Sequence, residues 1–472
     1  MNHLMLSLTN LKLLLPLLLS FIAAILLTLL AYYVPVHEWD ESRNGINAIE
    51  MLGNGDWLNL HYAGKVDTWN AKPPLLIWCI ALSFKIFGIS VFALRIPSII
   101  CGALFIYFFY LTSRLFIKPS ITIAITIGLI FTKIFYLDHI GFTADFDGML
   151  NLIIIMATYF YFKFILTQQS KFLHFASFML GLGFWVKGPA VILFCIPVLI
   201  HYLISTYESF NLKRSLSALG WFLILPLLWI CLILLFGKPH DGGFYGQSGN
   251  AIQTLLFNDL VGRALDSDFP NAQPVWYQFF SFVNIYFQLF EAIIYICLGY
   301  LIFMYYKSGK TIPTFYLFSG IVFIIYMICI SLMKETHRWY IAPISASVFW
   351  ILSMVYNWGK SRWRYAIFYI LIAINFGDFL MNSRIMKEIN GPEQKFFETV
   401  STLDSITFLP YFSQRIFFIA RSNHTPIDFF YHPGDEHVIC SIKHFEKFVE
   451  QFPSLCDMHI VATGKDYLLL DH

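Results

Sequence analysis

The sequence of 472 residues is strongly apolar: 58% of its residues are hydrophobic, 19% are aromatic and only 13% are charged. Soluble domains carry about 25% charged residues, so this composition excludes an ordinary soluble protein and predicts a chain that crosses a membrane several times. The net charge of +2 comes without a basic block, so nothing indicates a nucleic-acid partner.

The first apolar run, 13–34, follows a short polar start that contains Lys12. The run is too long for the hydrophobic region of a signal peptide, and no small-residue cleavage site follows it. We therefore predict a retained first span whose amino-terminal end lies in the cytoplasm.

The loop after this span opens on two adjacent carboxylates, Asp40 and Glu41. Such a pair at the mouth of a membrane helix is costly unless water, a partner or a substrate meets it, which makes this loop the candidate active-site loop. The pattern INAIEML that follows predicts a helix, and the glycines of GNGDW predict its end. A simpler interpretation stays open, in which Asp40 only caps this helix.

A membrane span needs about 20 apolar residues, and on this basis we predict about eleven spans. They lie at 13–34, 91–117, 119–137, 148–166, 172–186, 189–206, 217–237, 277–305, 312–333, 341–358 and 363–381. The apolar segment 74–88 is short and contains Lys85. We predict a juxtamembrane helix there, because a crossing would place the loops of Asp40 and Asp145 on opposite sides.

This count places basic residues in the cytoplasmic connections, among them Lys118, Lys163, Lys213, Lys307 and Lys360. The pattern predicts an integral membrane protein with a cytoplasmic N-terminus and an extracytoplasmic C-terminus.

The predicted fold class is an all-α polytopic membrane protein with a small C-terminal α/β domain. Residues 1–381 form the membrane module, including the first outer loop 35–90, and the polar segment 382–472 forms the small domain. Alternating and helical patterns in that segment predict mixed strands and helices. Cys440 and Cys456 could form a disulfide if this end is extracytoplasmic.

A second acidic pair, Asp145 and Asp147 in FTADFDGML, falls on the same outer side as Asp40. Capping of the next span is an equally simple interpretation of this pair. Three cationic positions share this side, at Lys72, at Lys187 within an apolar run, and in the segment from Lys334 to Arg338. Each could be an interfacial charge. Together they favour a site that holds a phosphate while a carboxylate activates a nucleophile.

Four motifs carry a family resemblance, which is continued by TADFDGML, VKGP and a late Tyr-Ile-Ala-Pro element at 340–343. The motifs are Asp-Glu-Ser-Arg at 40–43, Gly-Asp-Trp at 55–57, Lys-Pro-Pro at 72–74 and Arg-Ile-Pro-Ser at 95–98. Residues 30–345 resemble membrane glycosyltransferases of the GT-C type, in the bacterial branch related to protein O-mannosyltransferases and the lipid A aminoarabinose transferase.

The resemblance implies an inverting transfer of a sugar from a polyprenyl-phosphate carrier to a lipid, glycan or protein acceptor on the extracytoplasmic side. Asp40 becomes the candidate general base, and Asp145 and Asp147 become supporting carboxylates, with Glu41 as the fourth candidate of this group. The candidate cations for the donor phosphate are Lys72, Lys187, Arg43, Lys334 and Arg338.

The resemblance implies no required cofactor. Related enzymes often carry a Glu, implicated in a metal site, directly before the Lys-Pro dipeptide, and Ala71 stands there, although His240 and Asp241 in a later loop could supply ligands. The second acidic loop also departs from the family, with His139 to Phe142 in a stretch that commonly carries an Arg. Two rival functions are a non-catalytic transporter or flippase of lipid-linked glycans and a scaffold of a glycan-assembly complex.

Overall fold

The chain was analysed as a computed structural model, which describes the following residues. They are 2–67, 70–136, 138–239, 249–256, 275–287, 290–308, 312–333, 336–354, 399–408, 414–423, 427–428, 435–463, 467–471 and five single positions between 369 and 396.

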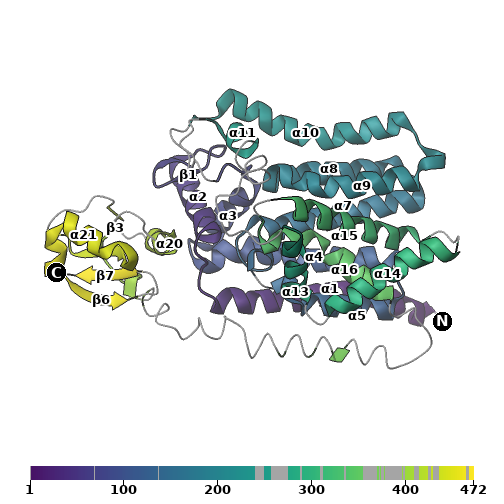
Figure 1. The fold of residues 1–472 in the computed structure, drawn as a ribbon, viewed down its shortest axis with the longest axis horizontal. Coiled ribbons are helices and arrows are strands. Elements are labelled where there is room, and N and C mark those ends of the chain that lie inside the picture. The colour runs from purple at the N-terminus through teal and green to yellow at the C-terminus, as the bar shows by residue number, and fades with distance from the viewer. Residues whose placement is uncertain are drawn as a thin grey trace.

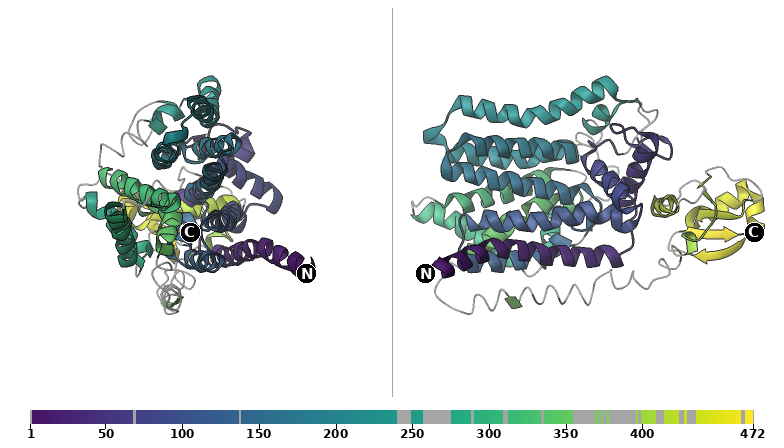
Figure 2. Two further views of the ribbon diagram at one scale, coloured as in Figure 1. Left: turned by 90° about the vertical axis from the view of Figure 1, so that its right-hand side faces the viewer. Right: turned by 180° about the vertical axis from the view of Figure 1, so that it is seen from behind.

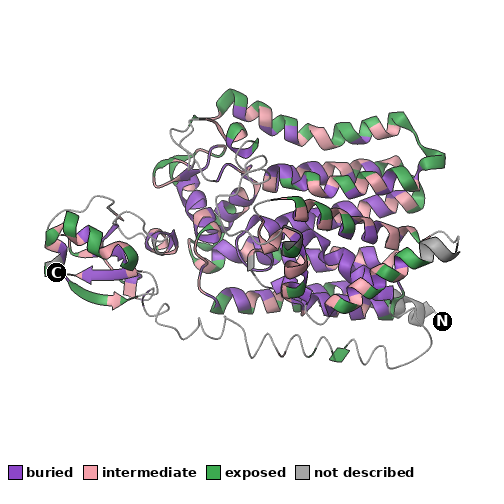
Figure 3. Cartoon of the chain, in the orientation of Figure 1, coloured by how far each residue is buried: buried purple, intermediate pink, exposed green. Residues whose placement is uncertain are grey.

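A bundle of long helices forms the body of the molecule, and a small sheet domain lies beyond one end of it (Figure 1). The long helices are α1 (Asn2–Tyr33), α4 (Val91–Arg114), α7 (Phe146–Thr167), α8 (Ser170–Lys187), α9 (Ile192–Ser205), α10 (Leu212–Phe236), α14 (Glu291–Ser308) and α15 (Thr314–Leu332). Neighbours pack in the order α1, α4, α7, α8 and α10, so that α10 lies at the edge of the bundle. Burial is densest in α4 and α7 and sparse along α10 (Figure 3).

Six helices of the described residues are long and apolar enough to cross a membrane, or seven if the bent pair Phe279–Phe287 and Glu291–Phe303 counts as one span. One of the six, Ser170–Ser205, contains a reversal. Lys187 bonds Asp147 near the start of α7, whereas His201 bonds Tyr161 far along the same helix. Gly188, with φ 57°, makes the turn between α8 and α9. The stretch therefore makes two antiparallel passes, as the sequence predicts.

The polytopic helical class is confirmed, but the described residues do not reach the predicted count of spans. The predicted span 119–137 is a short helix, α5 (Pro119–Ile130), followed by the single turn α6 (Lys133–Tyr136). The predicted span 341–358 begins as the 3₁₀ helix η6 (Arg338–Ile344) and continues as α16 (Ser345–Leu352). Most of 363–381 lies outside the described residues.

The first loop folds into a compact layer over one end of the bundle. It contains α2 (Asp40–Asn54), the hairpin β1 (His61–Tyr62) and β2 (Lys65–Val66), and α3 (Leu75–Phe87). Helix α2 ends at Gly55, whose left-handed φ of 71° suits glycine and whose N–H donates to the Met51 carbonyl. Helix α3 has 13 residues, fewer than the about 20 that a span needs, and packs on α2 and α4.

The C-terminal domain is a five-stranded mixed sheet in the order β4-β3-β5-β7-β6. Its strands are β3 (Ile406–Phe408), β4 (Ile427–Asp428), β5 (His437–Ser441), β6 (His459–Thr463) and β7 (Tyr467–Asp471). β3 is parallel to β4 and β5, and α20 (Gln414–Ser422) makes the β3-to-β4 crossover that a parallel pair requires. This confirms the predicted mixed character of the tail. Cys440 is a buried free thiol in β5, and the side chain of Cys456 lies outside the described residues.

The remaining described elements are short, except α13. They are α11 (Ala251–Gln253), α13 (Val275–Phe287), α21 (Phe445–Gln451), and the 3₁₀ helices η1 (Asp138–Ile140), η2 (Gly188–Val191), η3 (Tyr207–Ser209), η8 (Ile442–His444) and η9 (Pro453–Asp457). The two ends of the chain lie at opposite ends of the molecule, as Figure 1 and the right-hand view of Figure 2 show.

Candidate active site

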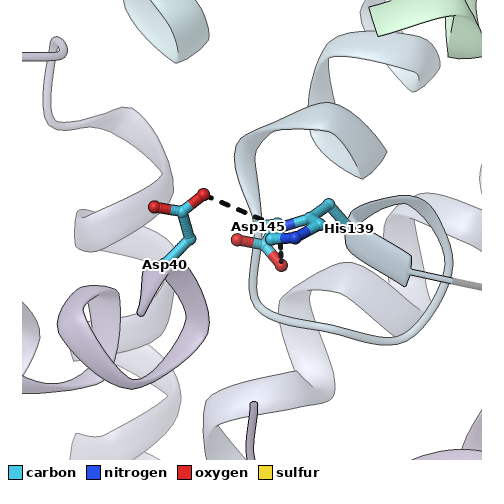
Figure 4. A group of neighbouring side chains, drawn as sticks. All are labelled: Asp40, His139 and Asp145. Carbon is cyan, nitrogen blue, oxygen red and sulfur yellow. Dashed lines mark ion pairs between the residues drawn. The ribbon is translucent and has the colours of Figure 1, made fainter. Parts of the chain in front are cut away.

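Two carboxylates, from Asp40 and Asp145, lie close to the His139 side chain at the end of the bundle that the first loop covers (Figure 4). His139 Nδ1 lies 3.0 Å from Asp145 Oδ2 and 3.7 Å from Asp40 Oδ2. Asp40 begins α2, whereas His139 and Asp145 belong to the segment that leads into α7. The structure therefore brings together the two acidic loops that the sequence places on one side.

Neither carboxylate has the simple capping role that the sequence suggests. Asp40 is the first residue of α2, and the residue at the N-cap is Trp39. Asp145 is the N-cap of α7, but its side chain makes no capping hydrogen bond. The Asp145 carboxylate turns toward His139 instead. The capping interpretation of Asp145 is therefore wrong.

His139 carries a positive charge at neutral pH in this setting. Burial alone would lower the pKa of His139, but the carboxylates of Asp145 and Asp40 raise it to about 9. Burial raises the pKa of Asp145, and the neighbouring imidazolium opposes that rise. The Asp40 side chain is 41% exposed, against 3% for Asp145, so Asp40 is the carboxylate that an acceptor can reach.

Glu41 points away from this cluster into a fully buried ion pair. Its two oxygens accept from Arg95 Nε at 2.6 Å and Arg95 Nη2 at 2.7 Å. The same oxygens accept from the backbone N–H groups of His37 and Ala144. Burial would raise the pKa of Glu41, but the charge and hydrogen bonds of Arg95 hold it at about 2. Glu41 is therefore a fixed anion.

Arg95 joins three parts of the chain around Glu41. Its remaining N–H groups donate to the carbonyls of Ala31, Val34 and Pro35 at the end of α1. All five donors of the guanidinium are thereby used, and the three carbonyls and two Glu41 oxygens that accept from them hold the end of α1 against the start of α2. This explains why an acidic pair and a later Arg-Ile-Pro-Ser occur together in the motif set.

Arg43 also makes a closed pair. It donates to both oxygens of Asp67 at 2.8 and 2.7 Å and lies 4.1 Å from the ring centroid of Tyr62. Asp67 accepts from Asn47 as well, and Asn47 accepts from Asn70. This network holds the first loop together, and it places Arg43 among its structural ion pairs.

Lys72 stands at the far end of the same network. Asn70 donates to Asn44 and Asn47, and its own oxygen lies 3.4 Å from Lys72 Nζ. Asn44 in turn donates to the carbonyl of Ala144, next to Asp145. Lys72 is thus positioned by a buried amide network that also contacts the second acidic loop.

Lys72 and Lys187 line one cavity of about 330 Å³. Lys187 Nζ lies 2.7 Å from both oxygens of Asp147 and 5.1 Å from the centroid of the Tyr340 ring. The rest of the wall is mostly apolar and comes from α7, η2, α9, α15 and η6. It includes Leu150, Ile192, Leu193, Ile196, Tyr326 and Met333. A cavity with cations and an apolar wall suits a lipid that carries a phosphate.

The 3₁₀ helix η6 joins the acid cluster to this cavity. The Trp339 ring lies against His139, with ring centroids 3.8 Å apart and planes tilted by 33°. The His337 ring stacks on Trp339, with centroids 4.6 Å apart. The next residue, Tyr340, lines the cavity. Arg338 begins η6, whereas Lys334, His240 and Asp241 lie outside the described residues.

Asp40, His139 and Asp145 are the described residues whose ligand atoms lie close enough to hold a metal ion, within 4.8 Å of one another. Histidine binds a metal through a neutral ring nitrogen, and the raised pKa keeps His139 protonated. The imidazolium already supplies the positive charge between the two carboxylates. The same three groups would hold a metal ion if the metal displaced that proton.

His139 and Trp339 are the site residues that sequence reasoning missed. His139 is visible in the sequence only as a departure from the family pattern six positions before Asp145. Its position in the same loop as Asp145 and Asp147 is the feature of the sequence that could have identified His139 as a site residue. Trp339 had no such signal, because its role depends on a contact across two hundred positions of the chain.

Residues 71–233 match the model of the dolichyl-phosphate-mannose-protein mannosyltransferase family. A curated relative is the undecaprenyl phosphate-alpha-4-amino-4-deoxy-L-arabinose arabinosyl transferase of Pseudomonas aeruginosa, 25% identical over 264 residues. The match covers 52% of this chain and 44% of that relative, so the chain matches less than half of its length.

Two solved structures share the fold. ArnT from Cupriavidus metallidurans, bound to undecaprenyl phosphate, superposes with a TM-score of 0.70 at 12% identity, over 96% of this chain and 97% of that one. The Archaeoglobus fulgidus oligosaccharyltransferase gives 0.52 at 13% identity, over 90% and 70% of the two chains. The resemblance predicted from the motifs is confirmed.

Proposed function

We propose, on the premise that this chain has the GT-C fold and carries a domain of the mannosyltransferase family named above, that it is an inverting glycosyltransferase. It moves a sugar from a polyprenyl-phosphate carrier to an acceptor hydroxyl. The observation that supports this most is the acid cluster of Asp40, His139 and Asp145 beside an apolar cavity lined by two lysines.

Asp40 is the general base of the proposed reaction. It removes the proton of the acceptor hydroxyl as the hydroxyl oxygen attacks the anomeric carbon. The bond from that carbon to the phosphate oxygen breaks in the same step, which inverts the configuration. His139, held by Asp145 and lying against Trp339, fixes the direction of the Asp40 carboxylate.

Lys72 and Lys187 stabilise the leaving phosphate by charge, so that it departs without a proton. Asp147 is the counter-ion of Lys187 and orients its ammonium group. Asp145 and Asp147, both at the start of α7, thus contact different parts of the site. Asp145 pairs with His139 beside the base, and Asp147 pairs with Lys187 in the donor cavity. Arg338 and Lys334 remain proposed third cations from the late loop.

The experiment that tests this function incubates purified protein with polyprenyl-phosphate-linked sugars of several kinds and measures donor consumption. We expect at least one donor to be consumed, and we expect the rate to survive a chelator because His139 fills the place of a cation. If no donor were consumed in the presence of a competent acceptor, the proposed catalytic function would be wrong. If the chelator abolished donor consumption, the acid cluster would be assigned a bound metal ion instead of a protonated His139.

The proposed location is a bacterial plasma membrane, with the site and the C-terminal domain on the extracytoplasmic side. Support comes from the contacts of α20 with α2, which place the C-terminal domain and the first loop on one side. A reporter that is active only in the cytoplasm, fused after His472, should be silent. An active reporter would show that the C-terminal domain, and with it the site, lies on the cytoplasmic side.

Removing either lysine of the cavity should weaken donor use. Lys72→Ala and Lys187→Ala each remove a charge-assisted contact worth roughly 1.5–3 kcal/mol, so donor affinity should fall about ten- to hundredfold. The measurement is the donor dependence of the transfer rate, with thermal unfolding in detergent as a check on folding. Lys85→Ala, an exposed lysine of α3, is the matched control. Unchanged donor affinity in both variants would move the phosphate site elsewhere.

A further inference from the structure

Helix α20 of the C-terminal domain lies directly against α2, the helix that begins at Asp40 (Figure 1). Glu38, two residues before Asp40, accepts hydrogen bonds from the backbone N–H groups of Gln414 and Arg415 at 2.6 and 3.2 Å. These N–H groups form the first turn of α20, where a helix has no acceptors of its own. The first loop therefore supplies the cap of a helix almost four hundred residues away.

The apolar contact between α20 and α2 is close. The Phe418 ring lies over the backbone of Gly45, so that a Cβ on Gly45 would overlap it. Phe418 also stacks on Phe84 of α3, with ring centroids 6.4 Å apart, and Phe417 meets Tyr62 of β1 edge to face at 5.6 Å. A glycine at position 45 is what allows α20 to approach this far.

Between Glu38 and Asp40, the backbone of Trp39 is strained. Trp39 has φ 67° and ψ −110°, a region that bulky residues rarely adopt. Trp39 is 63% exposed, so burial of the residue does not hold this conformation. A strained residue persists only where its surroundings fix it, and α20 provides the contacts on both of its sides.

Gln414 supplies the contact nearest to the strained residue. With its amide oriented to satisfy its neighbours, its nitrogen donates to the Trp39 carbonyl at 3.1 Å. Its oxygen then accepts from Arg43 Nη1 at 3.3 Å. Gln414 is buried at 7% exposure. One side chain of the C-terminal domain thus bridges the residue before Asp40 and the first turn of α2.

We propose that the C-terminal domain is a working part of the active site, because α20 clamps residues 38–45 and thereby sets the direction of Asp40 toward His139. Gln414 and Glu38 are positioning residues, since they act through the backbone of Trp39. This inference rests on the proposed function and adds to it a role for a domain that lies outside the matched residues 71–233. Lys72 and Lys187 lie on other elements, so loosening the clamp should change the rate of the chemical step rather than donor binding.

A pair of glycines in α2 offers a matched test. Gly45→Ala pushes Phe418 away, whereas a Cβ at Gly53 meets nothing within 4 Å, and both changes raise helix propensity equally. We expect Gly45→Ala and Gln414→Ala to lower kcat about ten- to hundredfold, because a misplaced base loses much of its effect, with the KM for the polyprenyl-phosphate sugar unchanged. Gly53→Ala and Ser422→Ala, at the far ends of the two helices, should keep the wild-type kcat.

Rates are divided by the fraction of folded protein, measured by thermal unfolding in detergent, so that simple instability does not pass as a positioning effect. A wild-type kcat in both Gly45→Ala and Gln414→Ala overturns the inference, and so does a change confined to KM. A wild-type protein that consumes no donor is a separate outcome, because it removes the proposed function itself.

Discussion

Asp40→Asn is expected to abolish sugar transfer while leaving the protein folded and able to bind donor. The amide keeps the size of the carboxylate and can still face His139, but it cannot take the proton of the acceptor hydroxyl. The expected loss is about 10²–10⁴-fold in kcat. The measurements are the transfer rate, the thermal midpoint in detergent and the binding of a polyprenyl-phosphate ligand.

Asp56→Asn is the matched control for this result. Asp56 belongs to the same loop, but it pairs with Lys238 at 2.7 Å and accepts from the Leu58 and Asn59 backbone. Its amide retains an acceptor oxygen for the two backbone bonds, and the pair with Lys238 lies away from the acid cluster, so transfer should stay close to the wild-type rate. Near-wild-type turnover by Asp40→Asn would shift the base to Asp145 or Asp147.

Glu41→Gln is expected to act on folding, in contrast to its neighbour. Glu41 and Arg95 are each fully buried and paired at 2.6 Å, so removing one charge leaves the other without its counter-charge. Breaking a buried pair in this way costs about 3–5 kcal/mol. The thermal midpoint should fall sharply, and the same loss is expected for Arg95→Gln.

The double variant separates this effect from a catalytic one. Glu41→Gln combined with Arg95→Met removes both charges, and it should recover part of the lost stability because no unpaired ion remains. Recovery of transfer together with stability would confirm Glu41 as a structural anion. A double variant that is stable but inactive would instead give Glu41 a part in the chemistry.

The grouping of Asp40, Glu41 and Arg43 shows where sequence reasoning works and where it stops. Their adjacency, together with span parity, predicted that Asp40 and Asp145 lie on one side, and the structure shows them on one histidine. Consecutive residues of a helix point about 100° apart, however, so neighbours in a motif face different partners. Asp40 faces His139, Glu41 faces Arg95 and Arg43 faces Asp67.

Contacts between distant segments cannot be predicted from local sequence patterns, because they depend on how the folded elements pack. The polar tail after 381 predicted a small mixed domain, and the sheet confirms it, but no local pattern tells where such a domain rests. The seating of Phe418 on Gly45 depends on the absence of one Cβ and on two helices meeting across the fold. The short helix α5 was also lengthened in the prediction, because apolar composition runs on through the break at 131–132.

The ion pair of Lys187 with Asp147 has a consequence for the binding of the spent carrier. A donor phosphodiester carries one negative charge, whereas the polyprenyl phosphate left after transfer is a monoester with a charge of about −1.5 to −2 at neutral pH. The two lysines of the cavity, with Asp147 offsetting one of them, therefore hold the spent carrier more firmly than the fresh donor. Spent carrier added at the start is therefore expected to inhibit turnover in competition with the donor.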